Sequence, residues 1–164
     1  MYTSKQIVDK CFKGVILEQP SCYHDFRGYY WTVHKEANKF NHDKISLSYK
    51  NVLRGIHGDF NTTKYITCVY GEVYCVIVDN RKNSNTFNEW RWLMLSHHNK
   101  NNITLPPGVG LSYLVISSEA SMLYKLSYQG NYSDINNQFT IPWNSNKLNI
   151  YWPIKTPIIQ ERDI

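Results

Sequence analysis

The chain alternates short apolar runs with polar turns, and this pattern predicts strands. Residues 14–17, 29–33 and 45–49 are brief runs rich in β-branched and aromatic side chains, which favour extended backbone. No stretch keeps the period of about 3.6 residues that marks an amphipathic helix. The pattern therefore predicts an all-β protein.

The middle of the chain carries the strongest pattern. Residues 64–79 indicate two strands joined at Gly71. In the second strand Val73, Cys75 and Ile77 alternate with other apolar residues, so both of its faces are expected to be covered. Further strands are predicted at residues 90–95, 103–105, 111–117 and 121–127.

Many short strands at roughly even spacing are typical of a jelly roll or a two-sheet barrel. The tail, residues 150–164, carries Pro153 and Pro157 and is expected to be extended, with a short final turn. A length of 164 residues suits one domain, so we predict a single domain over residues 1–164 with only short peripheral helices or turns.

Composition and charge exclude several partners. The net charge is +5, but the 18 Lys and Arg residues are scattered, whereas a nucleic-acid protein usually gathers them into a stripe. A basic site for a phosphorylated small molecule fits better. The first residues lack the apolar stretch of a signal peptide and no segment approaches about 18 apolar residues, so we expect a soluble, cytoplasmic protein without a membrane partner. The cysteines form no CxxC pair, and Cys68 and Cys75 in apolar runs are expected to be buried free thiols.

Several short motifs occur in a fixed order along nearly the whole chain. They are DFRG at 25–28, VLRGIH at 52–57, GEV at 71–73 with VDNR at 78–81, SNTFNEW at 84–90, the PxG turn at 105–108, YK at 124–125 and IYWP at 150–153. Together they resemble the signature of the dTDP-4-dehydrorhamnose 3,5-epimerase family. The resemblance implies a cupin-type jelly roll, a double-stranded β-barrel.

The resemblance also implies an activity. Such enzymes invert C3, C5 or both in a nucleotide-linked 4-keto sugar, and they need no cofactor and no metal because the ketone itself delocalises the carbanion. In the family the N-terminal segment, about residues 1–35 here, packs on the partner subunit of a homodimer.

Four residues carry over as catalytic candidates. His57 would be the base, since imidazole titrates near neutral pH, and Asp163 would orient it and stabilise its protonated form. Lys64 would stabilise the enolate oxygen. Tyr124 would return a proton from the opposite face, since a phenol is protonated at pH 7.

Two arginines are candidates for the diphosphate. The guanidinium groups of Arg54 and Arg27 match phosphate oxygens in a two-pronged way, and Arg27 is expected to serve the neighbouring subunit's site. Lys44 and His42 stand where the rhamnose enzymes carry a pocket asparagine and glutamine, which suggests altered substrate contacts.

The sugar is less well defined by the sequence. RGIHGD at 54–59 and HDK at 42–44 resemble segments of epimerases acting on GDP-linked 4-keto-6-deoxy-heptoses, and Asp59 is a further candidate for binding the substrate. Tyr132 resembles a second pocket tyrosine, but its spacing from Tyr124 leaves its role open. Leu111 replaces a pocket histidine of the family, so both the rhamnose substrate and inversion at two carbons are in question. A place in the biosynthesis of surface-polysaccharide sugars is expected.

Three other functions are alternatives for this sequence. A metal-dependent cupin needs two histidines and a carboxylate on one face, and His57 is followed by Gly58 and Asp59 without a second histidine. A 3,4-ketoisomerase shares the architecture and the substrate class, but the family motifs argue against it. A non-catalytic sugar-binding module would not be expected to keep all four catalytic candidates.

Overall fold

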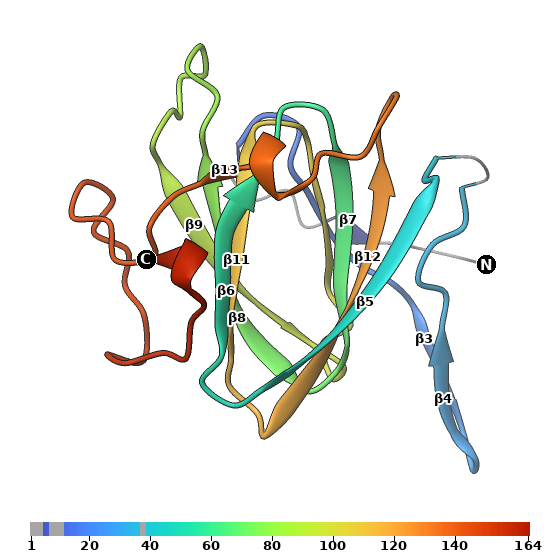
Figure 1. Ribbon diagram of the computed structural model, residues 1–164. Helices are drawn as coiled ribbons and strands as arrows, with labels where there is room; N and C mark the ends of the chain where they lie inside the picture. The colour runs from blue at the N-terminus through green and yellow to red at the C-terminus, as the bar shows by residue number, and fades with distance from the viewer. Residues whose placement is uncertain (1–4, 7–11, 37–38) are drawn as a thin grey trace.

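Two antiparallel sheets face each other and enclose the core (Figure 1). The computed structural model describes residues 5–6, 12–36 and 39–164. The first sheet has the order β1-β2-β10-β7-β12-β5. Its strands are β1 (Lys5–Gln6), β2 (Ile16–Gln19), β10 (Asn102–Leu105), β7 (Thr63–Tyr70), β12 (Glu119–Ser127) and β5 (His42–Tyr49).

The second sheet has the order β13-β6-β11-β8-β9. Its strands are β13 (Phe139–Thr140), β6 (Leu53–Gly58), β11 (Val109–Val115), β8 (Glu72–Asp79) and β9 (Trp90–Ser96). Among the described residues helical structure is confined to two 3-10 turns, η1 (Ile135–Asn137) and η2 (Glu161–Asp163). The predicted all-β jelly roll with short peripheral turns and a short final turn is therefore confirmed.

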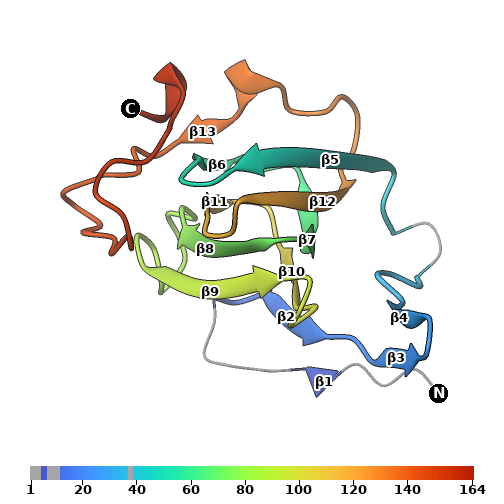
Figure 2. The ribbon, with the colours of Figure 1, turned by 90° about the horizontal axis from the view of Figure 1, so that it is seen from below.

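The core between the sheets follows the two-residue alternation of the strands. Val73, Cys75 and Ile77 of β8 meet Ile66 and Cys68 of β7 in one buried cluster. The opposite face of β8 belongs to a second cluster, in which apolar side chains of residues 141–159 cover the second sheet. Figure 2 shows this C-terminal segment, orange to red, running along the outside of that sheet. Both faces of β8 are buried, as predicted, because a segment far along the chain covers the outer one.

Gly71 turns the chain from one sheet into the other. β7 pairs with β10 and β12, whereas β8 pairs with β9 and β11, so the two adjacent strands are not partners. Gly71 has φ +77°, and a Cβ built on it would lie 2.1 Å from the carbonyl oxygen of Glu119. Only glycine is compatible with this turn.

The N-terminal segment divides into two parts. β2 pairs with β10 and so belongs to the protein's own first sheet. The hairpin of β3 (Cys22–Asp25) and β4 (Gly28–Trp31) is separate, and Figures 1 and 2 show it outside the two sheets, on the side away from the C-terminus. The expectation that residues 1–35 pack on a partner subunit stays a prediction, and residues 1–4 and 7–11 lie outside the described part of the chain.

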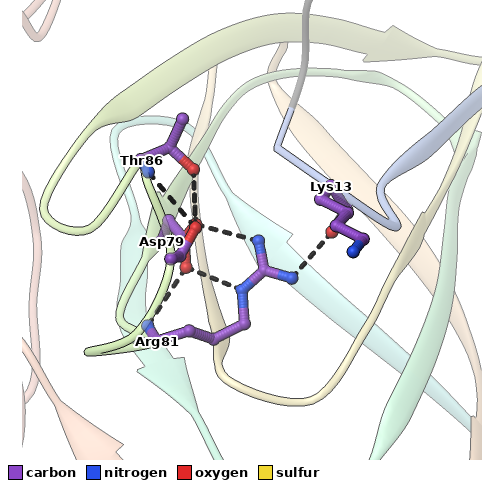
Figure 3. A network of polar contacts seen from close by, with 5 residues as sticks. Lys13, Asp79, Arg81 and Thr86 are labelled. Carbon is purple, nitrogen blue, oxygen red and sulfur yellow. Dashed lines mark hydrogen bonds and ion pairs between the residues drawn. The ribbon is translucent and has the colours of Figure 1, made fainter.

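A buried carboxylate anchors the loop after β8 (Figure 3). Asp79 is fully buried and accepts hydrogen bonds from the Arg81 side chain at 2.8 Å and from the hydroxyls of Ser84 and Thr86 at 2.6 Å. Arg81 Nη1 donates to the Lys13 carbonyl at 2.7 Å. The loop between β8 and β9 is therefore tied both to the end of β8 and to the turn before β2.

Among the described residues no helix is long and apolar enough to cross a bilayer. Cys68 and Cys75 are buried free thiols, as predicted, and burial raises the pKa of the Cys68 thiol to about 11.

Candidate functional site

A cavity of about 240 Å³ opens between the two sheets and gathers most of the predicted site residues. The first sheet contributes Lys44, Ile45, Ser46, Lys64, Tyr124 and Leu126. The second sheet contributes Arg54, His57, Leu111 and Tyr113, and the segment before β13 adds Tyr132 and Gln138. Two sheets with inward-facing polar positions thus form one lined pocket inside an otherwise apolar core.

His57 lies on β6 in the wall of this cavity, and 19% of its side chain is exposed. Its Nε2 atom is 2.6 Å from Asp163 Oδ1 and accepts a hydrogen bond from Arg162 Nε at 3.1 Å. Burial is the largest influence and lowers the pKa of His57, Asp163 opposes this, and the cations of Arg162 and Lys64 lower it further. The imidazole is therefore neutral at neutral pH, and the lone pair of its Nε2 accepts from Arg162.

Asp163 lies in η2 and is completely buried. Oδ1 lies 2.6 Å from His57 Nε2 as an ion-pair contact, and neither carboxylate oxygen has a hydrogen-bond partner among the described residues. A buried carboxylate without donors strongly favours a cation beside it. It is suited to stabilise His57 once the ring has taken up a proton.

Lys64 begins the buried part of β7 and directs its ammonium group into the cavity lining. Its Nζ is 3.5 Å from Asp59 Oδ2, and Asp59 Oδ1 accepts the backbone N–H groups of Asn61 and Thr62. Burial lowers the pKa of Lys64, and Asp59 opposes that effect. Asp59 itself is buried and does not line the cavity. It was predicted to contact the substrate, but in the structure it contacts Lys64 instead.

Tyr124 lies on β12, in the sheet that faces His57. Burial raises the pKa of Tyr124 well above its usual value, and the neighbouring Tyr113 raises it further. The phenol therefore stays protonated at neutral pH and can act as a proton donor.

The hydroxyl of Tyr113 connects the two sheets at the cavity floor. It lies 3.0 Å from Ser46 Oγ and 3.2 Å from Ser48 Oγ, and Arg54 Nε donates to Ser48 Oγ at 2.9 Å. Ser46 is also a hydrogen-bonding neighbour of Tyr124. The acid candidate and Arg54 are thus connected through one buried chain of hydroxyl groups.

Aromatic rings close another side of the pocket. Lys44 Nζ lies 4.0 Å from the centre of the Tyr132 ring, a cation–π contact. His42 packs edge-on against Tyr132, with ring centres 5.2 Å apart, and its Nδ1 is 3.1 Å from the hydroxyl of Tyr128. Tyr132 and Lys44 line the cavity, whereas His42 lies behind them and supports Tyr132. His42 was predicted to contact the substrate, but in the structure it packs against Tyr132, which lines the cavity.

Arg27 is far from the cavity of its own chain. It lies in the turn of the β3–β4 hairpin, its side chain is 74% exposed, and it is paired with Asp25. Arg27 does not line this chain's own cavity, and its expected contact with the neighbouring subunit's site stays a prediction. Leu111 pairs with His57 across β11 and β6, so an apolar side chain lies directly beside the base.

Sequence reasoning missed four residues of the site. Ser46 could have been found, because Ser46 and Ser48 repeat with a two-residue period and so indicate a polar inner face on the strand. Tyr113 is the hydrogen-bond partner of that face. Arg162 stands next to Asp163 but no pattern assigns it a target. Gln138 lies in an asparagine-rich loop and carries no signal.

The chemistry of the cavity is that of proton transfer beside an anion site. A neutral imidazole and a protonated phenol project from opposite sheets, and Lys44, Arg54 and Lys64 add three cations. Within the described ranges no three His, Cys, Asp or Glu side chains gather as a metal site. The residues present could move a proton to and from a substrate carbon while the cations hold negative charge.

Comparison with known proteins gives a consistent result. Residues 10–164 match the family described as dTDP-4-dehydrorhamnose 3,5-epimerase. The enzyme of that name from Shigella flexneri is 34% identical over 162 residues, covering 92% of this chain and 88% of the relative. The one from Escherichia coli K12 is 32% identical over 159 residues, covering 90% and 84%.

Solved structures agree. The Bacillus anthracis dTDP-4-dehydrorhamnose 3,5-epimerase, crystallised with TDP and PPi bound, superposes with a TM-score of 0.90 at 28% identity and covers 98% of this chain and 97% of that one. The Legionella pneumophila epimerase in complex with dTDP-4-keto-L-rhamnose gives a TM-score of 0.89 at 27% identity, covering 98% and 90%. These neighbours are cupin-type jelly rolls, so the predicted cupin fold is confirmed.

Proposed function

Since the chain belongs to the dTDP-4-dehydrorhamnose 3,5-epimerase family, we propose that it inverts a carbon next to the ketone of a nucleoside-diphosphate 4-keto-6-deoxy sugar. It is an epimerase by family. The observation that carries the proposed reaction is the opposition of His57 and Tyr124 on facing sheets of one cavity. Inversion at carbon requires removal of a proton from one face and its return to the other.

The reaction proceeds in two proton transfers. His57 takes the proton alpha to the ketone, the C–H electron pair forms the enolate, and the ring becomes an imidazolium next to Asp163. Tyr124 then donates its proton to the opposite face of the same carbon, which forms the new C–H bond and regenerates the ketone. After the two steps His57 is an imidazolium and Tyr124 is a phenolate. Proton exchange with solvent returns both groups to their starting states.

Lys64 is the group that holds the enolate oxygen. Its ammonium lines the cavity and is kept charged against burial by Asp59 at 3.5 Å. A donor aimed at developing negative charge typically contributes about 10²–10³ in rate. Arg54 and Lys44 supply the further positive charge that a diphosphate needs.

The finer identity of the sugar is part of the proposal. The RGIHGD and HDK segments favour a GDP-linked 4-keto-6-deoxy-heptose over dTDP-4-keto-rhamnose. Leu111, beside His57, takes the place of a pocket histidine of the family, so its contact with the sugar would be apolar. A role in making surface-polysaccharide sugars in the cytoplasm follows from such a substrate.

A homodimer is also proposed, because the first sheet has an uncovered apolar outer edge. Leu47 and Tyr49 on the outer face of β5 are 48% and 64% exposed. Contiguous exposed apolar surface of this kind marks protein interfaces. In such a dimer the projecting β3–β4 hairpin would carry Arg27 to the partner's cavity.

The dimer is tested by light scattering after size exclusion: wild type is expected at twice the chain mass of 19.3 kDa and Leu47→Lys at the monomer mass. A wild-type monomer would refute the dimer.

The reaction is tested by hydrogen exchange with solvent. GDP-linked and dTDP-linked 4-keto-6-deoxy sugars are incubated with enzyme in deuterated water and followed by NMR, carbon by carbon. Deuterium at C3 or C5 with the ketone still at C4 is expected. A ketone moved to C3 identifies a 3,4-ketoisomerase and refutes the proposal.

A matched variant separates catalysis from binding. His57→Asn removes the base but keeps a polar side chain of similar reach, so turnover should fall by about 10²–10⁴, the contribution typical of general-base catalysis. Binding of the nucleoside diphosphate, measured by calorimetry, should persist because the cations remain. Full turnover in His57→Asn would refute the assignment of the base.

A further inference from the structure

We propose that Arg162 is a positioning residue for the base: its guanidinium holds His57 in the neutral form and fixes the ring against the cavity wall through Gln138. This inference rests on the proposed function, in which His57 is the base. The role is assigned from the contacts that Arg162 makes with His57 and Gln138.

The guanidinium bridges the base and the cavity wall. Arg162 Nε donates to His57 Nε2 at 3.1 Å, and Arg162 Nη2 donates to Gln138 Oε1 at 3.1 Å. Gln138 lines the cavity and donates in turn to the Ser133 carbonyl at 2.9 Å. Arg162 is therefore held at two points, and its planar guanidinium restricts the orientation of the imidazole.

The local backbone explains how this contact forms. β13 pairs with β6 so that Thr140 lies opposite His57, which brings the preceding Gln138 beside the base. Asp134 caps η1 by accepting the N–H groups of Asn136 and Asn137, so the segment leading to Gln138 is ordered.

His57 Nε2 has a separate partner for each charge state. A lone pair on Nε2 accepts from Arg162, whereas a proton on Nε2 would be drawn to Asp163 Oδ1, 2.6 Å away and without another partner among the described residues. Arg162 thus stabilises the neutral base and Asp163 the protonated one. Proton uptake exchanges the first partner for the second.

The charges around His57 come from four elements, η2, β7, β5 and β6. Asp163 and Arg162 approach from η2 with opposite signs, and Lys64 approaches from β7 as a second cation. Lys44 and Arg54, from β5 and β6, are the other cations lining the same cavity, and Tyr124 and Tyr132 are its neutral titratable groups. Among the cations of the described residues, only Arg162 donates a hydrogen bond to the imidazole, so its removal should change the pKa of His57 most directly.

The test measures His57 directly by NMR, without substrate. The ring signals are titrated in wild type and assigned by comparison with His57→Asn. In Arg162→Gln the loss of the cation should move the His57 midpoint to higher pH. Lys155→Gln removes an exposed cation from the same C-terminal segment and serves as the matched control with no expected change.

A second variant separates charge from geometry. Arg162→Lys keeps the positive charge but cannot reach both His57 and Gln138 with a planar fork. Its titration midpoint should stay nearer the wild-type value, while kcat at the pH optimum falls by about tenfold or more, since small displacements of a catalytic group can cost up to about 10²-fold. In Arg162→Gln the acid limb of kcat/KM should follow the NMR midpoint upward.

The outcomes are distinct. An unchanged midpoint in a folded Arg162→Gln, together with unchanged kcat in Arg162→Lys, would overturn the inference. A shifted midpoint in an enzyme that turns over no 4-keto sugar nucleotide would refute the proposed function and leave the electrostatic role of Arg162 standing. If Arg162→Gln fails to fold, Arg162→Lys still decides through kcat.

Discussion

Replacing the buried carboxylate of Asp79 should destabilise the whole domain. Asp79 is fully buried and accepts five hydrogen bonds: three from Arg81, from its backbone N–H and from Nε and Nη2, and one each from the hydroxyls of Ser84 and Thr86. Asp79→Asn keeps the shape, but it removes the charge and turns an amide NH₂ toward these donors. The Arg81 guanidinium then loses its counterion.

The magnitude follows from burial. Removing one partner of a buried ion pair costs about 3–5 kcal/mol. Since 23% of the Arg81 side chain is exposed and water can solvate it, the lower end applies, about 3 kcal/mol. For a chain of this size each kcal/mol lowers Tm by roughly 2–4 °C, so a fall of about 6–12 °C is expected. Denaturant unfolding and calorimetry measure the two quantities.

The pH dependence gives an independent check. Burial alone would raise the pKa of Asp79, but the Arg81, Ser84 and Thr86 hydrogen bonds outweigh it and hold the pKa well below its usual value. A depressed pKa contributes stability above the unfolded value of about 3.9 and loses it as pH falls toward the folded value. The difference in stability between wild type and Asp79→Asn should therefore be constant from about pH 5 to 8 and shrink below about pH 4.

A nearby surface pair provides the control. Glu89 accepts from Arg91 at 2.7 Å, but both side chains are nearly half exposed, so Glu89→Gln should change stability by less than about 1 kcal/mol. An Asp79→Asn protein within 1 kcal/mol of wild type would refute the reasoning. So would a stability difference that persists unchanged in acid.

The network also reaches the active site. The Arg81 side chain packs under Gly108, where a Cβ would lie 2.4 Å from its Cγ, and Gly108 N–H donates to the Asp59 carbonyl at 2.8 Å. Asp59 in turn supports Lys64. Loss of the carboxylate at Asp79 should therefore lower kcat modestly even under conditions in which the variant is folded.

Three further predictions concern the cavity. Asp163→Asn removes the anion that raises the pKa of His57, so the acid limb of kcat/KM should move to lower pH while kcat falls; movement to higher pH would contradict the assigned sign. Asp59→Asn removes the anion that raises the pKa of Lys64, so the alkaline limb should move to lower pH, measured in the same pH–rate series; an unmoved limb would exclude Lys64 as the titrating cation. Tyr113→Phe deletes a buried hydroxyl bonded to two serines and should cost about 1–3 kcal/mol in denaturant unfolding, because the serines lose a partner; no loss would mean that water replaces it.

The local pattern was sufficient for the strands and for part of the site. Alternation predicted β7 and β8 and the turn at Gly71, because a period of two and a glycine with positive φ are properties of the backbone itself. β1, β3, β6 and β13 were not predicted as strands; the residues of β6 carry a family motif, and LRGIHG does not alternate. The family motifs identified His57, Lys64 and Tyr124, and all three line one cavity.

The remaining features depended on contacts between distant segments. Arg162 reaches His57 across 105 positions, and the Tyr113 hydroxyl meets Ser46 across 67. His42 and Asp59 were expected at the substrate, but strand register and burial put them behind Tyr132 and Lys64. A sequence pattern records which face of a strand is apolar; which sheet faces which, and therefore which side chains meet, is decided only when the sheets pack, because that packing depends on the whole core.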